Sequence, residues 1–166
     1  MSSNRHNDPV LDAALECVLA YGVRRTTLTD VARRAGVSRM TLYRRWPDVH
    51  SLVGDLMTRE WVRVAASVDL ADPVRAVVDG VRALRAHPLW RKIVEADPEL
   101  LLPYLIDRRG ATQEAILDLL EPAVGDRGRA ASILLVAQSF LISGPTMLDP
   151  DALDAQLTTI LERYLS

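Results

Sequence analysis

Apolar residues recur every three or four positions along most of the chain, which is the period of a helix buried on one face. The first such segment covers residues 9–21: Pro9 suits the first helical position, and Gly22 follows the last apolar residue, Tyr21. No segment shows sustained alternation of apolar and polar residues, so strands are not expected. The pattern therefore predicts an all-α protein.

Two short helices are predicted next, within residues 27–46. Thr27 suits the N-cap of the first, and Asp30, three residues on, resembles the acidic partner of a capping box. Gly36 lies where that helix must end, because a residue without Cβ adopts the left-handed conformation at low cost. Ala32 and Gly36 are both small, which predicts that the two helices approach closely at these positions.

Ser38 is the expected N-cap of the second helix, on which Leu42 and Trp46 lie four residues apart and face the first helix. The other side chains then face outward, where guanidinium groups, hydroxyls and an aromatic ring suit phosphates and base edges in a DNA major groove. The predicted DNA-binding residues of the two helices are Thr27, Thr29, Ser38, Arg39, Met40, Thr41, Tyr43, Arg44 and Arg45. Two caps, a glycine turn and a basic second helix together favour DNA binding over a surface hairpin with solvated arginines.

The run from Leu11 to about Leu56 resembles the DNA-binding domain of TetR-family transcriptional regulators. The matching residues are the Thr-Leu-Thr-Asp-Val-Ala and Ala-Gly-Val-Ser blocks within residues 27–38, the Thr-Leu-Tyr of residues 41–43, and Trp46-Pro47. The resemblance implies an N-terminal three-helix DNA-binding domain with a helix-turn-helix, followed by a helical domain for ligand binding and dimerisation. Where this family usually has a lysine near a phosphate, the chain has Val49, so that contact is not expected.

The rest of the chain is predicted to form one long helix and then a helical body. The long helix follows Pro47-Asp48 and covers about residues 49–67; in the TetR family this helix carries motion between body and head. Further helices are expected, between glycine and proline breaks, over residues 74–86, 88–96, 98–108, 112–124, 127–143 and 151–165. The predicted domains are a flexible arm over residues 1–8, a DNA-binding domain over 9–50 and a regulatory and dimerisation domain over 51–166.

The last two helices are apolar enough to serve as core or as the contact between two subunits. In so small a body we favour an isologous dimer contact, and in the TetR family these helices pair with their copies. The predicted contact residues are Leu134, Gln138, Leu141, Leu153, Leu157 and Ile160. The resemblance also implies a mostly apolar small-molecule cavity. Its predicted ligand-binding residues, each individually more typical of core, are Met57, Trp61, Trp90, Tyr104 and Phe140.

Charge is distributed unevenly along the chain. Residues 1–50 hold eight arginines against five acidic residues, a balance of +3, whereas residues 51–166 hold twelve basic against seventeen acidic residues, a balance of −5. A basic head on an acidic body directs the head toward phosphate. Arg24 and Arg25, between the first two helices, are placed either for backbone phosphates or for water.

Residue patterns of enzymes and metal sites are not found in the sequence. The three histidines have no ligand spacing, and no nucleophile elbow, dinucleotide-binding glycine turn or phosphate loop occurs. Glu95, Asp97 and Glu99 surround Pro98, which predicts a solvated corner rather than an acid–base pair. Cys17 stands alone at a core spacing, which argues against a disulfide or a cysteine metal cluster. Neither catalytic residues nor a metal or cofactor is expected.

These features together predict a cytoplasmic transcriptional regulator and not an enzyme. The N-terminus lacks an apolar signal region, and no apolar run reaches the ~18 residues of a membrane span. The expected partners are double-stranded palindromic operator DNA, a second copy of the chain and an unknown small-molecule effector that releases a repressor. Two alternatives stay open: a DNA-binding dimer without a ligand, and a helical interaction module that does not bind DNA.

Overall fold

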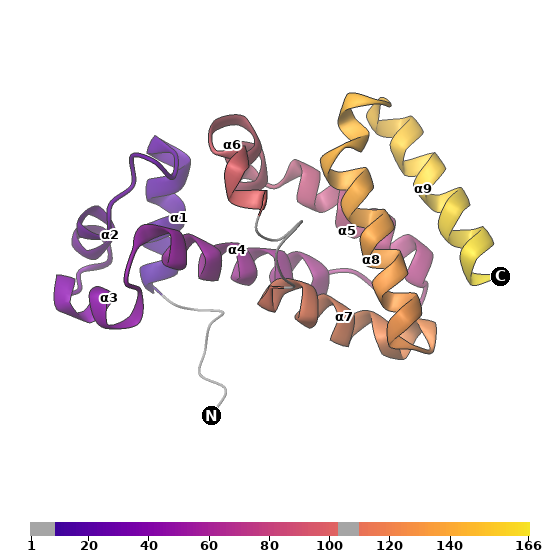
Figure 1. Ribbon diagram of the computed structural model, residues 1–166, viewed down its shortest axis with the longest axis horizontal. Coiled ribbons are helices and arrows are strands. Elements are labelled where there is room, and N and C mark those ends of the chain that lie inside the picture. Colours follow the sequence, from indigo (N-terminus) through magenta and orange to yellow (C-terminus); the bar gives the residue numbers. More distant parts are fainter. Residues whose placement is uncertain (1–8, 103–109) are drawn as a thin grey trace. The chain divides into compact units, whose positions relative to one another are not determined.

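The computed structural model describes residues 9–102 and 110–166, and every regular element in these ranges is a helix, as predicted. Figure 1 shows their order along the chain. The α-helices are α1 (Pro9–Tyr21), α2 (Leu28–Ala35), α3 (Arg39–Arg45), α4 (Val49–Ala66), α5 (Pro73–Ala86), α6 (Pro88–Ala96), α7 (Ala111–Val124), α8 (Arg127–Ile142) and α9 (Pro150–Leu165). Short 3-10 helices are η2 (Pro98–Leu101) and η4 (Gly144–Thr146). Among the described helices, none combines the length and hydrophobicity that crossing a lipid bilayer requires.

The described residues divide into two compact units. Unit 1 comprises residues 9–61 and 87–102, which hold α1, α2, α3, most of α4, α6 and η2. Unit 2 comprises residues 62–86 and 110–166, which hold the end of α4 with α5, α7, α8 and α9. Helices α6 and η2 thus belong to the same unit as the predicted DNA-binding helices.

The helix ends in unit 1 follow from local sequence. The Thr27 hydroxyl accepts a hydrogen bond from the Asp30 N–H, and Ser38 does the same for the Thr41 N–H, each at 3.1 Å. Gly36 ends α2 with φ of +67°, as its predicted role requires. A Cβ at Gly36 would meet nothing within 4 Å, so the predicted close approach of two helices there is wrong. The glycine is required by its positive φ and not by packing.

The core of unit 1 is built from the apolar faces of α1 to α4 and α6. Its most deeply buried large side chains are Leu11, Val18, Leu42, Leu52, Leu56, Leu89 and Ile93. Cys17 is also buried, as predicted, and burial raises the pKa of its thiol. Truncating one of these leucines to alanine typically costs about 2–5 kcal/mol, so the core holds the short helices α2 and α3 in place.

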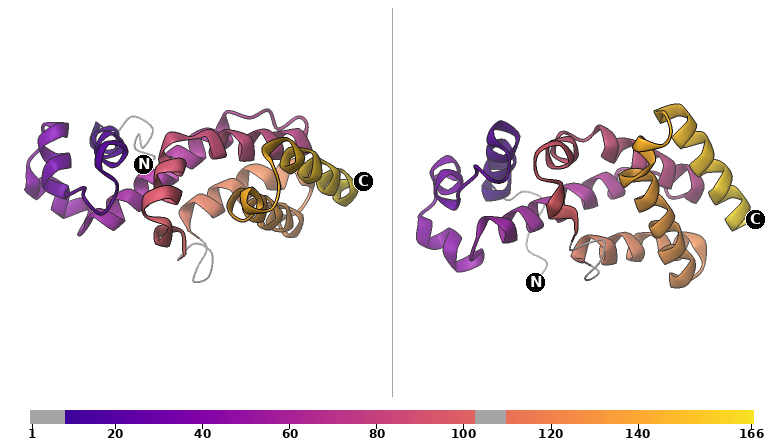
Figure 2. Two further views of the ribbon diagram at one scale, coloured as in Figure 1. Left: turned by 90° about the horizontal axis from the view of Figure 1, so that it is seen from above. Right: turned by 45° about the horizontal axis from the view of Figure 1, so that its top comes forward.

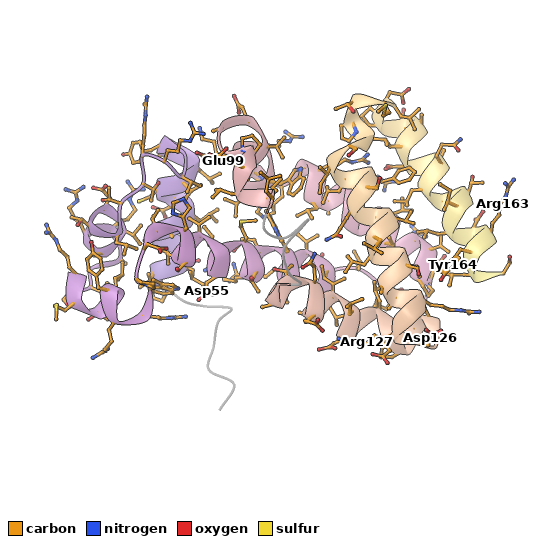
Figure 3. The ribbon with its side chains drawn as sticks, viewed as in Figure 1. Asp55, Glu99, Asp126, Arg127, Arg163 and Tyr164 are labelled. Atoms are coloured by element: carbon orange, nitrogen blue, oxygen red, sulfur yellow. The ribbon has the colours of Figure 1, made fainter. Side chains whose placement is uncertain are left out.

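In unit 2, α8 and α9 run antiparallel, joined through η4, and α5 packs against both (Figures 1 and 2). Arg82 and Arg85 of α5 both bind the carboxylate of Asp154 on α9. At the start of α8, Arg127 (labelled in Figure 3) binds three carboxylates of α7: Asp118, Glu121 and Glu114. These hydrogen bonds raise the pKa of Arg127. Ion pairs therefore link the surfaces of neighbouring helices around an apolar core.

Candidate DNA-binding interface

Helix α3 has one buried and one exposed face. Leu42 and the following Trp46 are 0% and 3% exposed, respectively, as their predicted inward orientation requires. The remaining side chains of the helix are exposed, and they are Arg39, Met40, Thr41, Tyr43, Arg44 and Arg45. Met40 is 81% and Tyr43 52% exposed, so large side chains extend into solvent without a cover from the described chain.

Trp46 is fixed from two sides at the end of α3. Its indole N–H donates a hydrogen bond to Asp55 on α4, with 2.9 Å between nitrogen and oxygen (Asp55 is labelled in Figure 3). The guanidinium carbon of Arg45 lies 4.1 Å from the centre of the Trp46 ring, a cation–π contact. This contact holds the Arg45 guanidinium over the ring face. The sequence analysis missed Asp55, although a buried indole N–H generally requires a partner.

The predicted DNA-binding hydroxyls take part in the helix starts. The Thr27 hydroxyl donates to the Asp30 carboxylate at 2.6 Å in addition to accepting from its N–H. The oxygens of Ser38 and Thr41 lie 2.9 Å apart in a further hydrogen bond. Thr29 is half-buried on α2. These side chains therefore order the two helices, whereas the arginines of α3 extend from them.

Ion pairing divides the six arginines of residues 24–44 into two groups. Three of them bind carboxylates: Arg24 with Glu99, Arg33 with Asp30, and Arg34 with Glu16. Side-chain hydrogen bonds to Glu99 and Glu16 raise the pKa of Arg24 and of Arg34, respectively. Within the part of the chain that the structure describes, Arg25, Arg39 and Arg44 have no ion pair or side-chain hydrogen bond. Positive charge on α3 is therefore not fully neutralised by the protein itself.

The sequence predicted a solvated corner around Pro98, and this prediction is wrong for Asp97. Its side chain is 2% exposed, and it accepts a hydrogen bond from the Val23 N–H at 2.9 Å. Glu99 binds Arg24. From the sequence, the expected partners of Arg24 were backbone phosphates of DNA or water. The physical reason is that both carboxylates face the segment between α1 and α2, which precedes them by more than seventy residues.

Three of the predicted ligand-binding residues are buried in unit 1: Met57, Trp61 and Trp90. The Trp61 ring meets Trp90 and His87 edge-to-face, with ring centres 5.9 Å and 5.5 Å apart. The imidazole Nε2 of His87 lies 3.5 Å from a carboxylate oxygen of Glu60, which is itself buried. The sequence analysis did not identify His87 or Glu60 as neighbours of the tryptophans, because each residue by itself carries no distinguishing signal.

The remaining two predicted ligand-binding residues lie outside the described part of unit 1. Phe140 is half-buried on α8 in unit 2, and Tyr104 lies outside the described residues. In the described ranges, no group of three or more histidine, cysteine, aspartate or glutamate side chains is arranged to hold a metal ion.

The predicted dimer-contact residues fall into two groups. Leu141, Leu153 and Leu157 are buried within the chain itself, at 8%, 2% and 1% exposure. Leu134 and Gln138 are half-buried, and Ile160 is 41% exposed. The helical pattern reveals an apolar face but not which neighbour covers it, so sequence alone could not separate these groups.

Comparison with known proteins agrees with this geometry. Residues 10–55 match the sequence profile of the bacterial regulatory proteins of the tetR family. An uncharacterized HTH-type transcriptional regulator of Mycobacterium bovis is 36% identical over 94% of this chain and 92% of its own length. The crystal structure of the TetR family repressor AlkX from Dietzia sp. superposes with a TM-score of 0.73 at 25% identity, covering 95% of this chain and 96% of AlkX. A TetR transcriptional regulator from Rhodococcus sp. has a TM-score of 0.66 at 19% identity, over 93% of each chain.

The profile spans α1 to α3 and the start of α4, where the exposed arginines and the glycine turn lie. The mycobacterial relative extends the similarity over nearly the whole chain. The relatives are transcriptional regulators and not enzymes. This chain therefore belongs to the tetR family of bacterial regulatory proteins and is a DNA-binding transcriptional regulator with a helix-turn-helix.

Proposed function

We propose that the chain is a cytoplasmic repressor that binds a palindromic operator as a homodimer and leaves it when a small molecule binds. The observation that carries the DNA-binding part is the exposed face of α3, on which Arg39 and Arg44 lack an ion-pair partner among the described residues. Guanidinium groups in this setting suit phosphates and guanine edges. The proposed contacts, on α3 and at the starts of both helices, are Thr27, Thr29, Ser38, Arg39, Met40, Thr41, Tyr43, Arg44 and Arg45.

The proposed domains follow from this assignment: an arm over residues 1–8, a DNA-binding domain over residues 9–50 and a regulatory and dimerisation domain over residues 51–166. Repression is supported by the similarity to AlkX, whose structure is described as that of a TetR family repressor. A repressor needs only to occupy its operator, and an exposed DNA-binding face is sufficient for that.

A homodimer is supported by apolar side chains on the outer surface of α8 and α9 in unit 2. Leu135 is 66% exposed and lies three residues from the half-buried Gln138. Ile160 and Tyr164 are 41% and 45% exposed and lie four residues apart on α9. Exposed apolar side chains on two neighbouring helices are typical of a surface that a partner covers. An isologous contact through this surface would present two copies of α3 to two half-sites.

Release by a small molecule is the remaining part of the proposal. Its proposed contacts are Met57, Trp61, Trp90, Tyr104 and Phe140. In unit 1 the edge-to-face rings of Trp61 and Trp90 adjoin the polar pair of His87 and Glu60. Apolar walls with a few polar groups are the usual composition of a small-molecule site. Such coupling is reciprocal: if the effector weakens operator binding by a given factor, operator DNA must weaken effector binding by the same factor.

The test begins with a randomised pool of DNA duplexes, from which the wild-type protein enriches its own binding sequence. We expect inverted repeats whose half-sites are about one helical turn, 34–36 Å, apart. Fluorescence anisotropy with the enriched duplex then compares variants. Arg44→Ala and Tyr43→Ala should each weaken binding by about 1–3 kcal/mol, as the loss of one good contact does.

Arg75→Ala is the matched control, because Arg75 is an exposed arginine on α5 in unit 2. Its affinity should equal that of the wild type. Failure to enrich any duplex, or equal affinities for the α3 variants and the control, would refute the assignment. A titration with small apolar compounds, followed by tryptophan fluorescence with and without the duplex, tests release. Equal compound affinity in both conditions would favour the DNA-binding dimer without a ligand.

A further inference from the structure

The short segment that joins α1 to α2, residues 22–26, is bound by residues from the end of α6. We call this segment the α1–α2 link. The Val23 N–H donates to the Asp97 carboxylate at 2.9 Å, and Asp97 is 2% exposed. Asp97 is also the C-cap of α6, where its own N–H donates to the Ile93 carbonyl at 2.9 Å. A buried carboxylate therefore connects the end of α6 directly to the backbone of the link.

The start of the link lies close to the end of α6. Gly22 has φ of +80°, and a Cβ added there would lie 3.4 Å from an Asp97 carboxylate oxygen and 3.9 Å from the Ala96 Cβ. The link is closed at its other end by Thr26, whose hydroxyl donates to the Gly22 carbonyl at 2.8 Å and whose side chain is buried. The backbone between these two residues is thus held on the surface of α6.

Arg24 adds a second connection between the link and the segment after α6. Its Nε and Nη2 donate to one Glu99 carboxylate oxygen at 3.1 Å and 2.7 Å, and its Nε lies 3.4 Å from Asp97. Glu99 is labelled in Figure 3. The Arg24 side chain is 72% exposed. Water therefore screens the pair, so its contribution to stability is small.

The link leads directly to Thr27, the N-cap of α2. Helices α2 and α3 contain eight and seven residues, which is too short for either to be stable alone. Their direction must therefore come from tertiary contacts and from the chain that precedes them. A fixed link limits the positions that α2 can adopt relative to α1, and α3 follows α2 through the turn at Gly36.

We propose that the end of α6 positions the helix-turn-helix for DNA, with Asp97 as a positioning residue that fixes the α1–α2 link. Glu99 supports it by holding Arg24 along the same surface. This inference rests on the proposed DNA binding through α3. It assigns a direct role in the DNA-binding head to a segment that lies outside residues 9–50.

Hydrogen exchange of the full-length protein without DNA is the first measurement. Asp97→Ala removes both the acceptor and the charge, whereas Asp97→Asn keeps an oxygen that can accept from the Val23 N–H. We expect Asp97→Ala to increase exchange in residues 22–46 and to leave α8 and α9 unchanged, and Asp97→Asn to restore most of the protection. A merely stabilising role would instead increase exchange throughout the chain, through global unfolding.

DNA affinity is the second measurement, made with the enriched duplex at a temperature where each variant is folded. Asp97→Ala should weaken binding about tenfold, the effect of leaving one buried donor without its acceptor, and Asp97→Asn should recover most of it. The matched control is Asp149→Ala, which removes a carboxylate N-cap from α9 in unit 2. It should lower the melting temperature without changing the affinity.

The outcomes separate this inference from the proposed function. Unchanged exchange in residues 22–46 and unchanged affinity in Asp97→Ala would overturn the positioning role while DNA binding stands. An equal loss in Asp149→Ala would also overturn it. If the protein enriches no duplex, DNA binding is refuted. A local increase in exchange in Asp97→Ala would in that case still show that Asp97 fixes the link. If Asp97→Ala does not fold, Glu99→Ala replaces it, and unchanged exchange in the link would then contradict the inference.

Discussion

The indole N–H of Trp46 and the carboxylate of Asp55 form a hydrogen bond of 2.9 Å that joins the end of α3 to α4. Trp46 also carries the Arg45 guanidinium on its ring face. The orientation of one exposed arginine of α3 thus depends on a carboxylate of the next helix. This arrangement lowers the conformational entropy that Arg45 would lose on binding a phosphate.

Trp46→Phe tests this dependence, because phenylalanine keeps an aromatic ring beneath Arg45 but has no N–H for Asp55. We expect a loss of about 1 kcal/mol in the free energy of unfolding, the usual net value of one hydrogen bond. DNA binding should weaken and lose part of its salt dependence, as expected for a disturbed phosphate contact. Urea unfolding and anisotropy at several salt concentrations measure the two effects.

Asp55→Ala provides the comparison, since it removes the other partner of the same hydrogen bond. The double variant should then be no weaker in DNA binding than either single variant, because both act through one contact. Additive losses would mean that Trp46 and Asp55 influence DNA binding independently.

Gly36, at the end of α2, and Gly80, inside α5, form a matched pair that tests the effect of backbone conformation on stability. A Cβ at either position meets nothing within 4 Å, but only Gly36 has a positive φ, of +67°. Gly36→Ala should therefore destabilise the protein by about 1–2 kcal/mol through the left-handed conformation. Gly80→Ala, inside α5, should stabilise it by about 0.5–1 kcal/mol. Thermal unfolding of both variants measures the difference, and a loss at both sites would point to side-chain crowding instead.

Acid should loosen the DNA-binding unit through two carboxylates. The hydrogen bond from Arg24 lowers the pKa of Glu99, and the backbone hydrogen bond from Ser51 lowers the pKa of Asp48. A carboxylate with a lowered pKa in the folded state stabilises the fold above its ordinary pKa, here 4.5 for Glu99 and 3.8 for Asp48. That stabilisation is lost as the pH falls through the folded value.

The expected result is a decline in unfolding free energy below about pH 4.5 that becomes shallower in Glu99→Gln. Urea unfolding at closely spaced pH values measures the slope. Glu95→Gln is the control, since Glu95 is exposed on the neighbouring turn of α6. Identical slopes for wild type and Glu99→Gln would show that the Arg24–Glu99 pair does not contribute.

Local features of the fold could be predicted from sequence, and long-range ones could not. The caps at Thr27 and Ser38 and the stop at Gly36 depend on residues at most four positions apart, so each could be predicted from sequence. The burial of Asp97 depends on a backbone N–H 74 residues earlier, and no pattern in the sequence indicates that this contact forms. The exposed face of α3 was predictable because its buried counterpart, Leu42 with Trp46, has helical spacing.

The same limit explains the partition of the C-terminal helices. Leu157 and Ile160 both belong to an apolar helix, but Leu157 is 1% and Ile160 41% exposed. Helical periodicity gave no reason to treat them differently. The packing of α5 and α8 against α9 determines which of its side chains are covered.

A charge at Ile160 should therefore test the proposed dimer where a charge at Leu157 cannot. Leu157→Asp would bury an unpaired carboxylate in the core of the chain, which costs several kcal/mol and unfolds the subunit. Ile160→Asp and Leu135→Asp place the charge on the exposed surface, where substitutions usually change stability by less than about 0.5 kcal/mol. In a dimer that uses this surface, however, the same charges would be buried in the subunit contact without a partner, which is costly.

Light scattering and circular dichroism together distinguish these effects. We expect Ile160→Asp and Leu135→Asp to be folded monomers, and Ile160→Asn to dimerise more weakly than wild type but better than Ile160→Asp. The monomers should bind a single half-site with much lower affinity than the dimer binds the full inverted repeat, because the second contact is no longer linked to the first. Asp151→Asn, at the opposite end of α9 from Tyr164, should remain dimeric. Dimers of unchanged stability in both charged variants would place the subunit contact on another surface, since a charge buried without a partner in the contact would weaken the dimer.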